Sequence, residues 1–287
     1  MNDWLFGAGW ALTKRVPEPV ARAAFATVGD QVWRRRGTGV QRLEANLRRA
    51  CPAHDDAQLR ALSRRALRSY LRYWCETFRL PTWSADRVVS SVVTDDEHYL
   101  RDAYAAGDGV VIALPHTANW DHAGAWVALS GMPFTTVAER LRPERLYERF
   151  VAYRESLGME VLPLTGGDGA TFHTLAERAR AGRLICLVAD RDLSSSGVEV
   201  DLLGEAARLP AGPAVLARAT RAVLLPATLS YEGSLLLRIR FHEPVPRVAG
   251  ADGARIMMQQ VADAFSAGIR AHPEDWHMLQ RVFAADL

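Results

Sequence analysis

A histidine stands where an apolar segment of this chain ends. The stretch ALPHTANWD, residues 113–121, overlaps the apolar run GVVIALP at 109–115, and its histidine is His116. In open α/β sheets, ligands bind at the carboxyl ends of the strands. A histidine there can take a proton near neutral pH, and a nearby carboxylate can fix its tautomer and stabilise its charged form. The stretch therefore indicates a general base, with a histidine that merely caps a helix as the alternative.

Two aspartates are candidates for the supporting carboxylate. Asp121 lies one helical turn beyond His116, so we expect its side chain to turn back toward the histidine. The segment VADRD at 188–192 places Asp190, Arg191 and Asp192 at the end of another apolar run. Charged groups are seldom buried unpaired, so these three indicate either a second carboxylate beside the histidine or an ion-pair network at the sheet edge. The spacing alone leaves open which aspartate contacts His116.

The elements that position these residues alternate along the chain from about residue 88. Helical stretches such as 142–157 and 170–182 separate most of the apolar runs, and a final helix is predicted over 253–271. This alternation predicts an α/β fold with a central, largely parallel sheet flanked by helices on both faces. SLLLRIRF at 234–241 follows a turn and is predicted to pair antiparallel at one end of the sheet. The apolar runs are VVSSVV at 88–93, GVVIALP at 109–115, PFTTVA at 133–138, MEVLPL at 159–164, RLICLVAD at 183–190 and AVLLPATL at 222–229.

The N-terminal quarter differs in composition and is predicted to be a helical extension. Residues 1–80 contain 15 Lys and Arg against 7 Asp and Glu, whereas residues 81–287 contain 20 against 26. A basic region attracts phosphates, on nucleic acid or on anionic lipid. DWLFGAGWAL at 3–12 is apolar and aromatic, and a long amphipathic helix is predicted from about Asp55 to Arg79. Its arginines either form a solvated face or rest on phospholipid head groups; they are Arg60, Arg64, Arg65, Arg68 and Arg72.

Composition sets further bounds. We find no repeat or linker in the 287 residues, which predicts a single domain over 1–287, made of a membrane-associating part at 1–80 and a catalytic core at 81–287. Three separated cysteines without a CxxC pair favour a reducing compartment and no zinc site. His272 and His277 are five positions apart and lack the glutamate that a zincin zinc-binding motif has between its histidines, so no metal site is predicted. No apolar run approaches the roughly 18 to 20 residues of a membrane span, so any membrane contact is expected from the cytoplasmic side.

Longer segments carry a family resemblance. HTANWD at 116–121 contains the H-x4-D signature of glycerolipid acyltransferases, and the words around it are more specific. From about Trp4 to Leu287 the chain resembles the actinobacterial phosphatidylinositol mannoside acyltransferases, which are similar to the acyltransferases of lipid A synthesis. The segments that carry the resemblance are ALPHTANWDHAG, FTTVAERLRPERLYERFVAYRESLG, CLVADRDLSSSGVEVDLLGEAARLPAGPAVLA and HPEDWHMLQ.

The resemblance implies an activity and roles for single residues. The enzymes of this family are peripheral proteins on the cytoplasmic face of the plasma membrane. They move a fatty acyl group, preferably palmitoyl, from coenzyme A to the 6-hydroxyl of the mannose on position 2 of inositol. Acyl-CoA is then a co-substrate and no cofactor is implied. The catalytic residues would be His116, Asp121 and Asp190, where the family carries a glutamate at the last position. The substrate-binding residues implied by the resemblance would be Glu139, Arg154, Trp276 and His277. The strand-end position adds Arg191 and Asp192, and either Arg191 or a backbone N–H would stabilise the oxyanion.

The resemblance implies direct transfer, with His116 removing the proton of the attacking hydroxyl. The sequence has no GxSxG nucleophile elbow that would suggest a covalent intermediate. TGGDG at 165–169 lacks the lysine of a P-loop and is interpreted as a turn. Two alternatives stay open. The acceptor could be another glycolipid or a lysophospholipid, or the basic quarter could be a nucleic-acid-binding module. The second is disfavoured because no RRM-type aromatic motif or helix-turn-helix pattern is visible.

Overall fold

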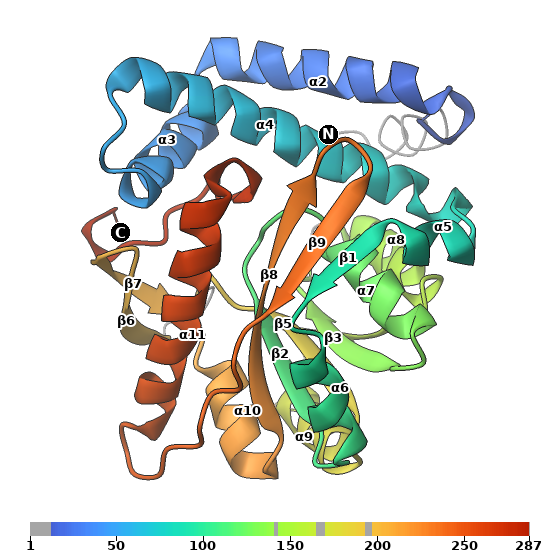
Figure 1. The fold of residues 1–287 in the computed structure, drawn as a ribbon, viewed down its shortest axis with the longest axis vertical. Coiled ribbons are helices and arrows are strands. Elements are labelled where there is room, and N and C mark those ends of the chain that lie inside the picture. The colour runs from blue at the N-terminus through green and yellow to red at the C-terminus, as the bar shows by residue number, and fades with distance from the viewer. Residues whose placement is uncertain (1–12, 141–142, 165–169, 193–196, 287) are drawn as a thin grey trace.

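A seven-stranded sheet forms the centre of the computed structural model, which describes residues 13–140, 143–164, 170–192 and 197–286 (Figure 1). The strand order is β1-β9-β8-β2-β5-β3-β4. β8, β2, β5, β3 and β4 run parallel, while β9 pairs antiparallel with β8 and parallel with β1. The strands are β1 Val92–Asp95, β2 Val110–Leu114, β3 Phe134–Ala138, β4 Glu160–Pro163, β5 Leu184–Val188, β8 Val223–Glu232 and β9 Leu236–Phe241.

Helices cover both faces of this sheet, which confirms the predicted α/β class. One face packs against α9, α10, α11 and a separate hairpin of β6 and β7, and the other packs against α5, α6, α7 and α8. Side chains of a strand point alternately to the two faces, so Val111 and Ala113 join the first core while Ile112 and Leu114 join the second. The elements are α5 Ala85–Ser90, α6 His98–Ala105, α7 Trp120–Leu129, α8 Glu144–Glu155, α9 Ala170–Arg180, α10 Gly212–Thr220, α11 Gly253–Ala271, β6 Val198–Leu202 and β7 Glu205–Leu209.

The register of the parallel strands brings the chemically active segments to one edge. Leu114 of β2 pairs with Val188 of β5, and Thr136 of β3 pairs with Cys186 of β5. The segments that follow these three strands carry His116, Asp190 and Glu139. All three segments therefore leave the sheet side by side.

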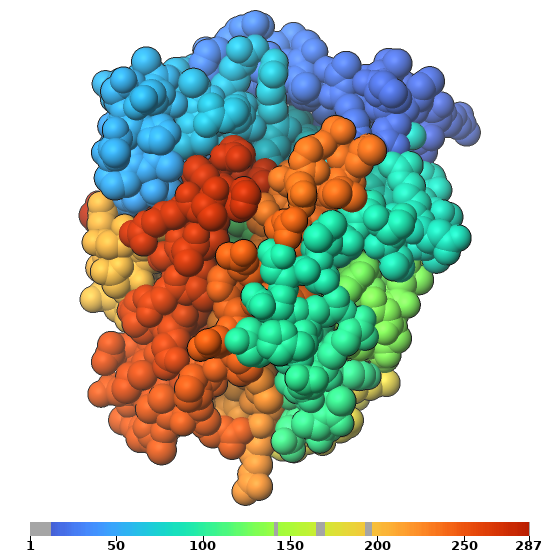
Figure 2. Space-filling model, in the orientation of Figure 1, coloured from blue at the N-terminus to red at the C-terminus, as the bar shows by residue number. Residues whose placement is uncertain are grey.

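Three N-terminal helices cap this edge and one end of the molecule (Figures 1 and 2). They are α2 Glu18–Arg35, α3 Thr38–Ala50 and α4 Asp56–Arg79. α4 begins with a capping box, in which the Asp55 carboxylate accepts from the Gln58 N–H and the Gln58 side chain accepts from the Asp55 N–H. The turn between β8 and β9 reaches this cap, where Arg72 donates to the Gly233 carbonyl and Arg22 donates to the Ser234 carbonyl.

The arginines of α4 are largely used to hold the cap together. Arg64 and Arg68 both pair with the buried Asp30 of α2, and their guanidinium groups hold the pKa of that carboxyl well below its usual range. Arg60 pairs with Glu44 of α3, and Arg72 pairs with Glu76. Arg65 and Arg68 are exposed, as a solvated face requires, whereas Arg60, Arg64 and Arg72 are partly buried and paired with protein carboxylates.

Several element predictions were right and others need correction. The predicted strands at 109–115, 133–138, 159–164, 183–190 and 222–229, the antiparallel pairing of 234–241 and the final helix are confirmed. The strand at 234–241 is not at the end of the sheet as predicted, because β1 pairs with its outer edge. The run VVSSVV was predicted as one strand, but its first half lies in α5 and only its second half enters β1. A Ser84 side chain that accepts from the Arg87 N–H caps that short helix. DWLFGAGWAL and TGGDG lie outside the described residues.

Gly109, just before β2, is the glycine that the fold depends on most directly. Its φ is +79°, and a Cβ there would lie 2.2 Å from the Ala179 carbonyl oxygen. Gly107 has a similar φ of +78°, but nothing lies within 4 Å of its virtual Cβ. We expect Gly109→Ala to lower the free energy of unfolding by more than about 1 kcal/mol, and by clearly more than Gly107→Ala. Urea unfolding of both variants measures this; equal losses would mean that the backbone contact adds nothing to the positive φ.

Candidate active site

Asp190 is the carboxylate that contacts the histidine. Its Oδ1 lies 2.5 Å from His116 Nδ1, and its Oδ2 accepts from the His116 backbone N–H at 2.9 Å. Asp190 is fully buried at the end of β5, whereas the His116 side chain is 31% exposed. An ionised carboxylate at Nδ1 selects the tautomer in which Nδ1 carries the proton, so Nε2 is left with its lone pair. The aspartate spans the distance although its side chain is one methylene shorter than the family's glutamate.

A tryptophan completes the surroundings of this carboxylate. Trp276 is fully buried and donates from Nε1 to Asp190 Oδ2 at 2.9 Å. Burial favours the protonated acid, but the charge of His116 and the hydrogen bonds from His116 and Trp276 outweigh it and lower the pKa of Asp190. Trp276 was expected to line the substrate site. It lies behind Asp190 instead, where it holds the carboxylate.

Asp121 of the H-x4-D signature does not turn back to the histidine as expected. Its Oδ1 accepts from Arg154 Nε at 2.8 Å, and its Oδ2 accepts from the Tyr73 hydroxyl at 3.0 Å. Burial opposes the charge of Arg154, but the Asp121 carboxylate outweighs burial and raises the pKa of the guanidinium. Because the signature also places Asp121 in the first turn of α7, its charge is favourable at that helix terminus. Asp121 therefore joins α7, α8 and α4.

The C-terminal segment is paired with the histidine loop. The His277 N–H donates to the His116 carbonyl at 2.8 Å, and the Ala118 N–H donates to the Asp275 carbonyl at 2.9 Å. Ser69 of α4 donates to Asp275 Oδ1 at 2.6 Å and lies 2.9 Å from His277 Nε2. If the Ser69 proton goes to Asp275, Nε2 must donate, and His277 Nδ1 carries the lone pair. Burial lowers the pKa of His277 to about 3 and raises the pKa of Asp275 to about 6.

A groove runs past His116 and contains most of the predicted substrate-binding residues. It encloses about 600 Å³, which is within the range of small-molecule sites. Five of the six predicted residues line it, namely Glu139, Arg154, Arg191, Asp192 and His277. Aromatic side chains of α4, α7 and α8 form part of its wall; they are Tyr70, Tyr73, Trp74, Trp120, Tyr147 and Phe150. The groove therefore combines charged groups with a large aromatic surface.

Glu139 and Arg154, which the resemblance places together, have different partners. Glu139 lies 3.5 Å from Arg191, and Arg154 pairs with Asp121. The Nε of Arg191 is buried and, among the described residues, has no hydrogen-bond partner. Asp192 accepts from the Gly197 N–H at 2.9 Å. Arg191 thus has donor capacity that the described part of the protein leaves unused.

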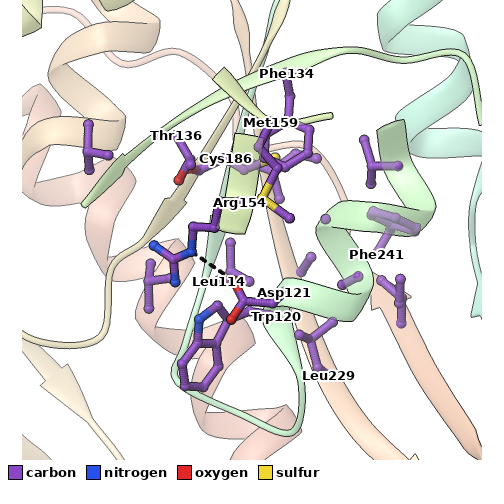
Figure 3. Close-up of a pocket in the computed structure, with 18 residues that line it drawn as sticks. Leu114, Trp120, Asp121, Phe134, Thr136, Arg154, Met159, Cys186, Leu229 and Phe241 are labelled. Atoms are coloured by element: carbon purple, nitrogen blue, oxygen red, sulfur yellow. Dashed lines mark hydrogen bonds and ion pairs between the residues drawn. The ribbon is translucent and has the colours of Figure 1, made fainter. Parts of the chain in front are cut away.

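A second, apolar pocket opens beside the groove (Figure 3). Trp120, Val137, Arg154 and Val188 line both, so the two spaces meet next to His116. The rest of the pocket lies between α7 and one face of the sheet. Its lining there includes Ile112, Leu114, Ala123, Gly124, Val127, Phe134, Met159, Cys186, Ala227, Leu229, Ile239 and Phe241. Burial raises the pKa of the Cys186 thiol, so this wall carries no charge at neutral pH.

Sequence reasoning missed the contribution of α4. Tyr73, Ser69 and Glu76 have no motif of their own, yet each contacts the site segments. Glu76 accepts from Asn119 Nδ2 at 3.1 Å, and the Asn119 side chain in turn accepts from the His122 N–H and caps α7. The only available signal was that a buried polar residue on an amphipathic helix needs a partner. Among the described residues, no group of three or more His, Cys, Asp or Glu could hold a metal ion.

Comparisons with known proteins point to one group. Residues 1–285 match the bacterial lipid A biosynthesis acyltransferase family. A phosphatidylinositol mannoside acyltransferase of Mycolicibacterium smegmatis is 46% identical over 287 residues, which cover the whole of this chain and 93% of the relative. One from Mycobacterium tuberculosis is 45% identical over 294 aligned residues, which cover the whole of this chain and 90% of the relative. These matches confirm the resemblance inferred from the motifs.

The lowered pKa of the buried His277 predicts how the stability of the protein depends on pH. Unfolded His277 takes a proton near pH 6.5 and folded His277 only near 3, so its contribution to stability is complete above about pH 6.5 and is lost as the pH falls. Asp275 acts in the opposite direction between about pH 4 and 6, because its pKa is raised in the folded state. We therefore compare wild type with His277→Gln, which leaves Asp275 in place. Between pH 6.5 and 5 we expect the wild type to lose about 1 to 2 kcal/mol relative to the variant.

Urea unfolding at the two pH values measures this difference. A constant difference across the range would mean that folding does not lower the pKa of His277.

Proposed function

Because the chain belongs to the bacterial lipid A biosynthesis acyltransferase family, we propose that it transfers a fatty acyl group from acyl-CoA to a phosphatidylinositol mannoside. The acceptor position we propose is the 6-hydroxyl of the mannose on position 2 of inositol, and the preferred acyl group is palmitoyl. The observation that carries the proposal is the Asp190–His116 pair, which lies where the groove of charged and aromatic side chains meets the apolar pocket. Acyl transfer to a hydroxyl needs a general base, a space for the acyl chain and a space for the rest of the two substrates.

The apolar pocket suits the acyl chain of the donor. Most of its described lining is hydrocarbon, aromatic or sulfur. The exceptions are Thr136, whose hydroxyl donates to the Cys186 carbonyl, and the pair Asp121 and Arg154, which neutralise each other near the junction. Each buried CH₂ group contributes about 0.8 kcal/mol, so an acyl chain that fills the pocket is held firmly without polar contacts. A chain seated there would present its thioester at the junction beside His116. The groove then holds the rest of coenzyme A and the acceptor, and the unused Nε of Arg191 is available to an anionic group.

The chemistry follows from the tautomer of His116. Nδ1–H donates to Asp190, so Nε2 accepts the proton of the mannose hydroxyl as its oxygen attacks the thioester carbonyl. The C–S bond then breaks, and the coenzyme A thiolate leaves and receives the proton from the imidazolium. Asp190 stays ionised and stabilises the imidazolium while it exists. No covalent acyl-enzyme and no cofactor enter this scheme.

The identity of the acceptor is the least specific part of the proposal, because other lipids also carry a hydroxyl group that could be acylated. Glu139 is half-exposed in the groove and can accept hydrogen bonds from sugar hydroxyls, while Arg154 can donate to them. Another glycolipid or a lysophospholipid would offer the same hydroxyl to His116. The test is incubation of the protein with palmitoyl-CoA and mannosylated phosphatidylinositol, followed by mass spectrometry. A lysophospholipid offered in parallel separates the two acceptors, and acylation of that lipid alone would overturn the proposed substrate.

We also propose that the N-terminal quarter rests on the cytoplasmic face of the plasma membrane. No described helix is long and apolar enough to cross a membrane. The outer side of α2 exposes Val20, Val28 and Val32, and Arg34 and Arg35 follow at its end. An apolar strip beside basic groups is typical of interfacial helices. This placement would bring a lipid acceptor to the cap above the site.

His116→Ala tests the mechanism. General-base catalysis contributes about 10² to 10⁴ in rate, so we expect a loss of that size in turnover. Binding of acyl-CoA should be nearly unchanged, because the base does not hold the acyl chain. Asp190→Asn should also slow the reaction, since an amide cannot stabilise an imidazolium. Asp190→Glu should slow it too, because aspartate already makes the contact at 2.5 Å.

Turnover and acyl-CoA binding of the three folded variants are measured side by side. A folded His116→Ala protein that acylates the mannoside at a near-normal rate would contradict the proposed mechanism.

Membrane binding is tested by co-sedimentation with vesicles. Each basic group near an anionic surface contributes about 1 kcal/mol, so binding to anionic vesicles should weaken as the salt concentration rises. Neutral vesicles and duplex DNA serve as controls. Equal binding to neutral and anionic vesicles at every salt concentration would contradict the electrostatic part. Preferential binding to DNA would favour the nucleic-acid alternative.

A further inference from the structure

We propose that Met159, backed by Gly124 and Phe134, forms the floor of the apolar pocket and sets the length of the acyl chain that the enzyme accepts. This inference rests on the proposed function, because it assigns the pocket to the acyl chain. It adds the residues that would discriminate between chains differing by two carbons.

The pocket is a slot between the sheet and α7 (Figure 3). On the sheet side, alternate residues of each strand point into it, such as Ile112 and Leu114 on β2. The pairing Ile112↔Cys186 and Cys186↔Thr136 sets these side chains in a row across the sheet. The middle of the slot is lined by small side chains, including Ala123 and Ala227. Small residues facing each other across the slot leave space that larger apolar residues would fill.

The slot deepens away from the groove. The groove end lies at the carboxyl edge of the sheet, where Val137 and Val188 line both spaces. Phe134 is the first residue of β3 and lies about 13 Å from the other end of that strand, at about 3.3 Å per residue. At this depth Phe134, Met159 and Val127 are all buried. We therefore place the floor of the pocket at these residues, and the distance from the groove end to this floor bears on chain length.

Met159 is fixed in place by the end of α8. Gly158 has a φ of +88°, and the Met159 N–H donates to the Arg154 carbonyl at 3.2 Å, so the chain turns sharply after the helix. α8 carries Arg154 at the mouth of the pocket, and the turn after this helix carries Met159 at the floor. A methionine side chain is unbranched and adaptable, so its position depends on what packs against it.

Gly124 is what lets Met159 occupy this position. A Cβ on Gly124 would lie 2.6 Å from Met159 Cε and 2.9 Å from Phe134 Cζ, both closer than real contacts allow. Gly124 is in the interior of α7, where glycine is unfavourable by about 1 kcal/mol relative to alanine. A glycine at this position is explained by the space that Met159 and Phe134 need. Gly124→Ala must displace the thioether or narrow the slot, whereas Met159→Ala must deepen it.

The two substitutions should shift chain preference in opposite directions. Equimolar lauroyl-, myristoyl-, palmitoyl-, stearoyl- and arachidoyl-CoA compete for the mannoside acceptor, and mass spectrometry gives the product profile. One methylene in an apolar pocket changes selectivity by about 10- to 200-fold, so we expect Gly124→Ala to lower the ratio of longer to shorter products at least about tenfold. Met159→Ala should raise the same ratio at least about tenfold. The double variant should return toward the wild-type profile, because the added methyl no longer meets a thioether.

Matched controls separate chain length from stability. Met132→Ala removes a buried methionine from the same core without touching the pocket, and Gly39→Ala adds a Cβ in a helix where its nearest neighbour is at an ordinary 3.6 Å. Neither should change the profile. A shift with Met132→Ala equal to that with Met159→Ala, or no shift with either pocket variant, would overturn the inference. Gly124→Ala carries the test alone if Met159→Ala does not fold.

A second readout distinguishes this inference from the proposed function. Free fatty acids of the same lengths are used to displace a fluorescent fatty acid from the wild type and variants, with no acceptor present. Variant-dependent length preference in binding without any transfer to the mannoside would uphold the floor and reject the proposed acceptor. Normal transfer with an unchanged preference in both assays would reject the floor and leave the proposed function intact.

Discussion

The buried Asp190 carboxylate is the constraint on which the site depends. A fully buried charge is costly unless it is paired and hydrogen-bonded, and Asp190 meets this condition with one ring nitrogen, one backbone N–H and one indole N–H. These three donors come from the loop after β2 and from the C-terminal segment. The same carboxylate that orients the His116 ring therefore also fixes the path of both segments. Removing its charge would release the histidine, the loop and Trp276 together, so orientation and local folding cannot be separated here.

Asp190 and Asp121 have different structural roles in the site. Asp190 serves the ring, while Asp121 serves the frame around it by joining Arg154 of α8 to Tyr73 of α4. Glu76 adds a parallel link from α4 and from Arg22 of α2 to Asn119, which caps α7. The N-terminal helices thus complete the walls and the supports of the site. α2 is thus connected through the Glu76 carboxylate to Asn119, which lies in the same segment as His116.

Much of this could be read from the sequence, and the limits have physical causes. The alternation of strands and helices gave the α/β class, and strand ends gave His116, Asp190 and Glu139, because both depend on local patterns. The partner of Asp121 could not be found this way, since Tyr73 and Arg154 are 48 and 33 positions away. Helical spacing favoured a contact with His116, but the ion pair with Arg154 prevailed. The resemblance assigned Trp276 to the substrate site. Its burial could not be predicted, because it depends on a bridge between Thr117 and the segment of Trp276 that only the folded chain reveals. The helical start of VVSSVV was not predicted, because the Ser84 cap favours a helix there more than the short β-branched run favours a strand.

The apolar slot shows how function can alter packing. A sheet face covered by a helix normally closes with interdigitating side chains, and an unfilled apolar space costs stability. Here small residues on the sheet and on α7 keep the space open, and a glycine in the helix interior adds its own cost. An acyl chain in the slot would restore the missing contacts, so binding of the donor and stability of this core should be linked. The space that an acyl chain would fill thus lies next to the Asp190 carboxylate, which the fold keeps fully buried against His116.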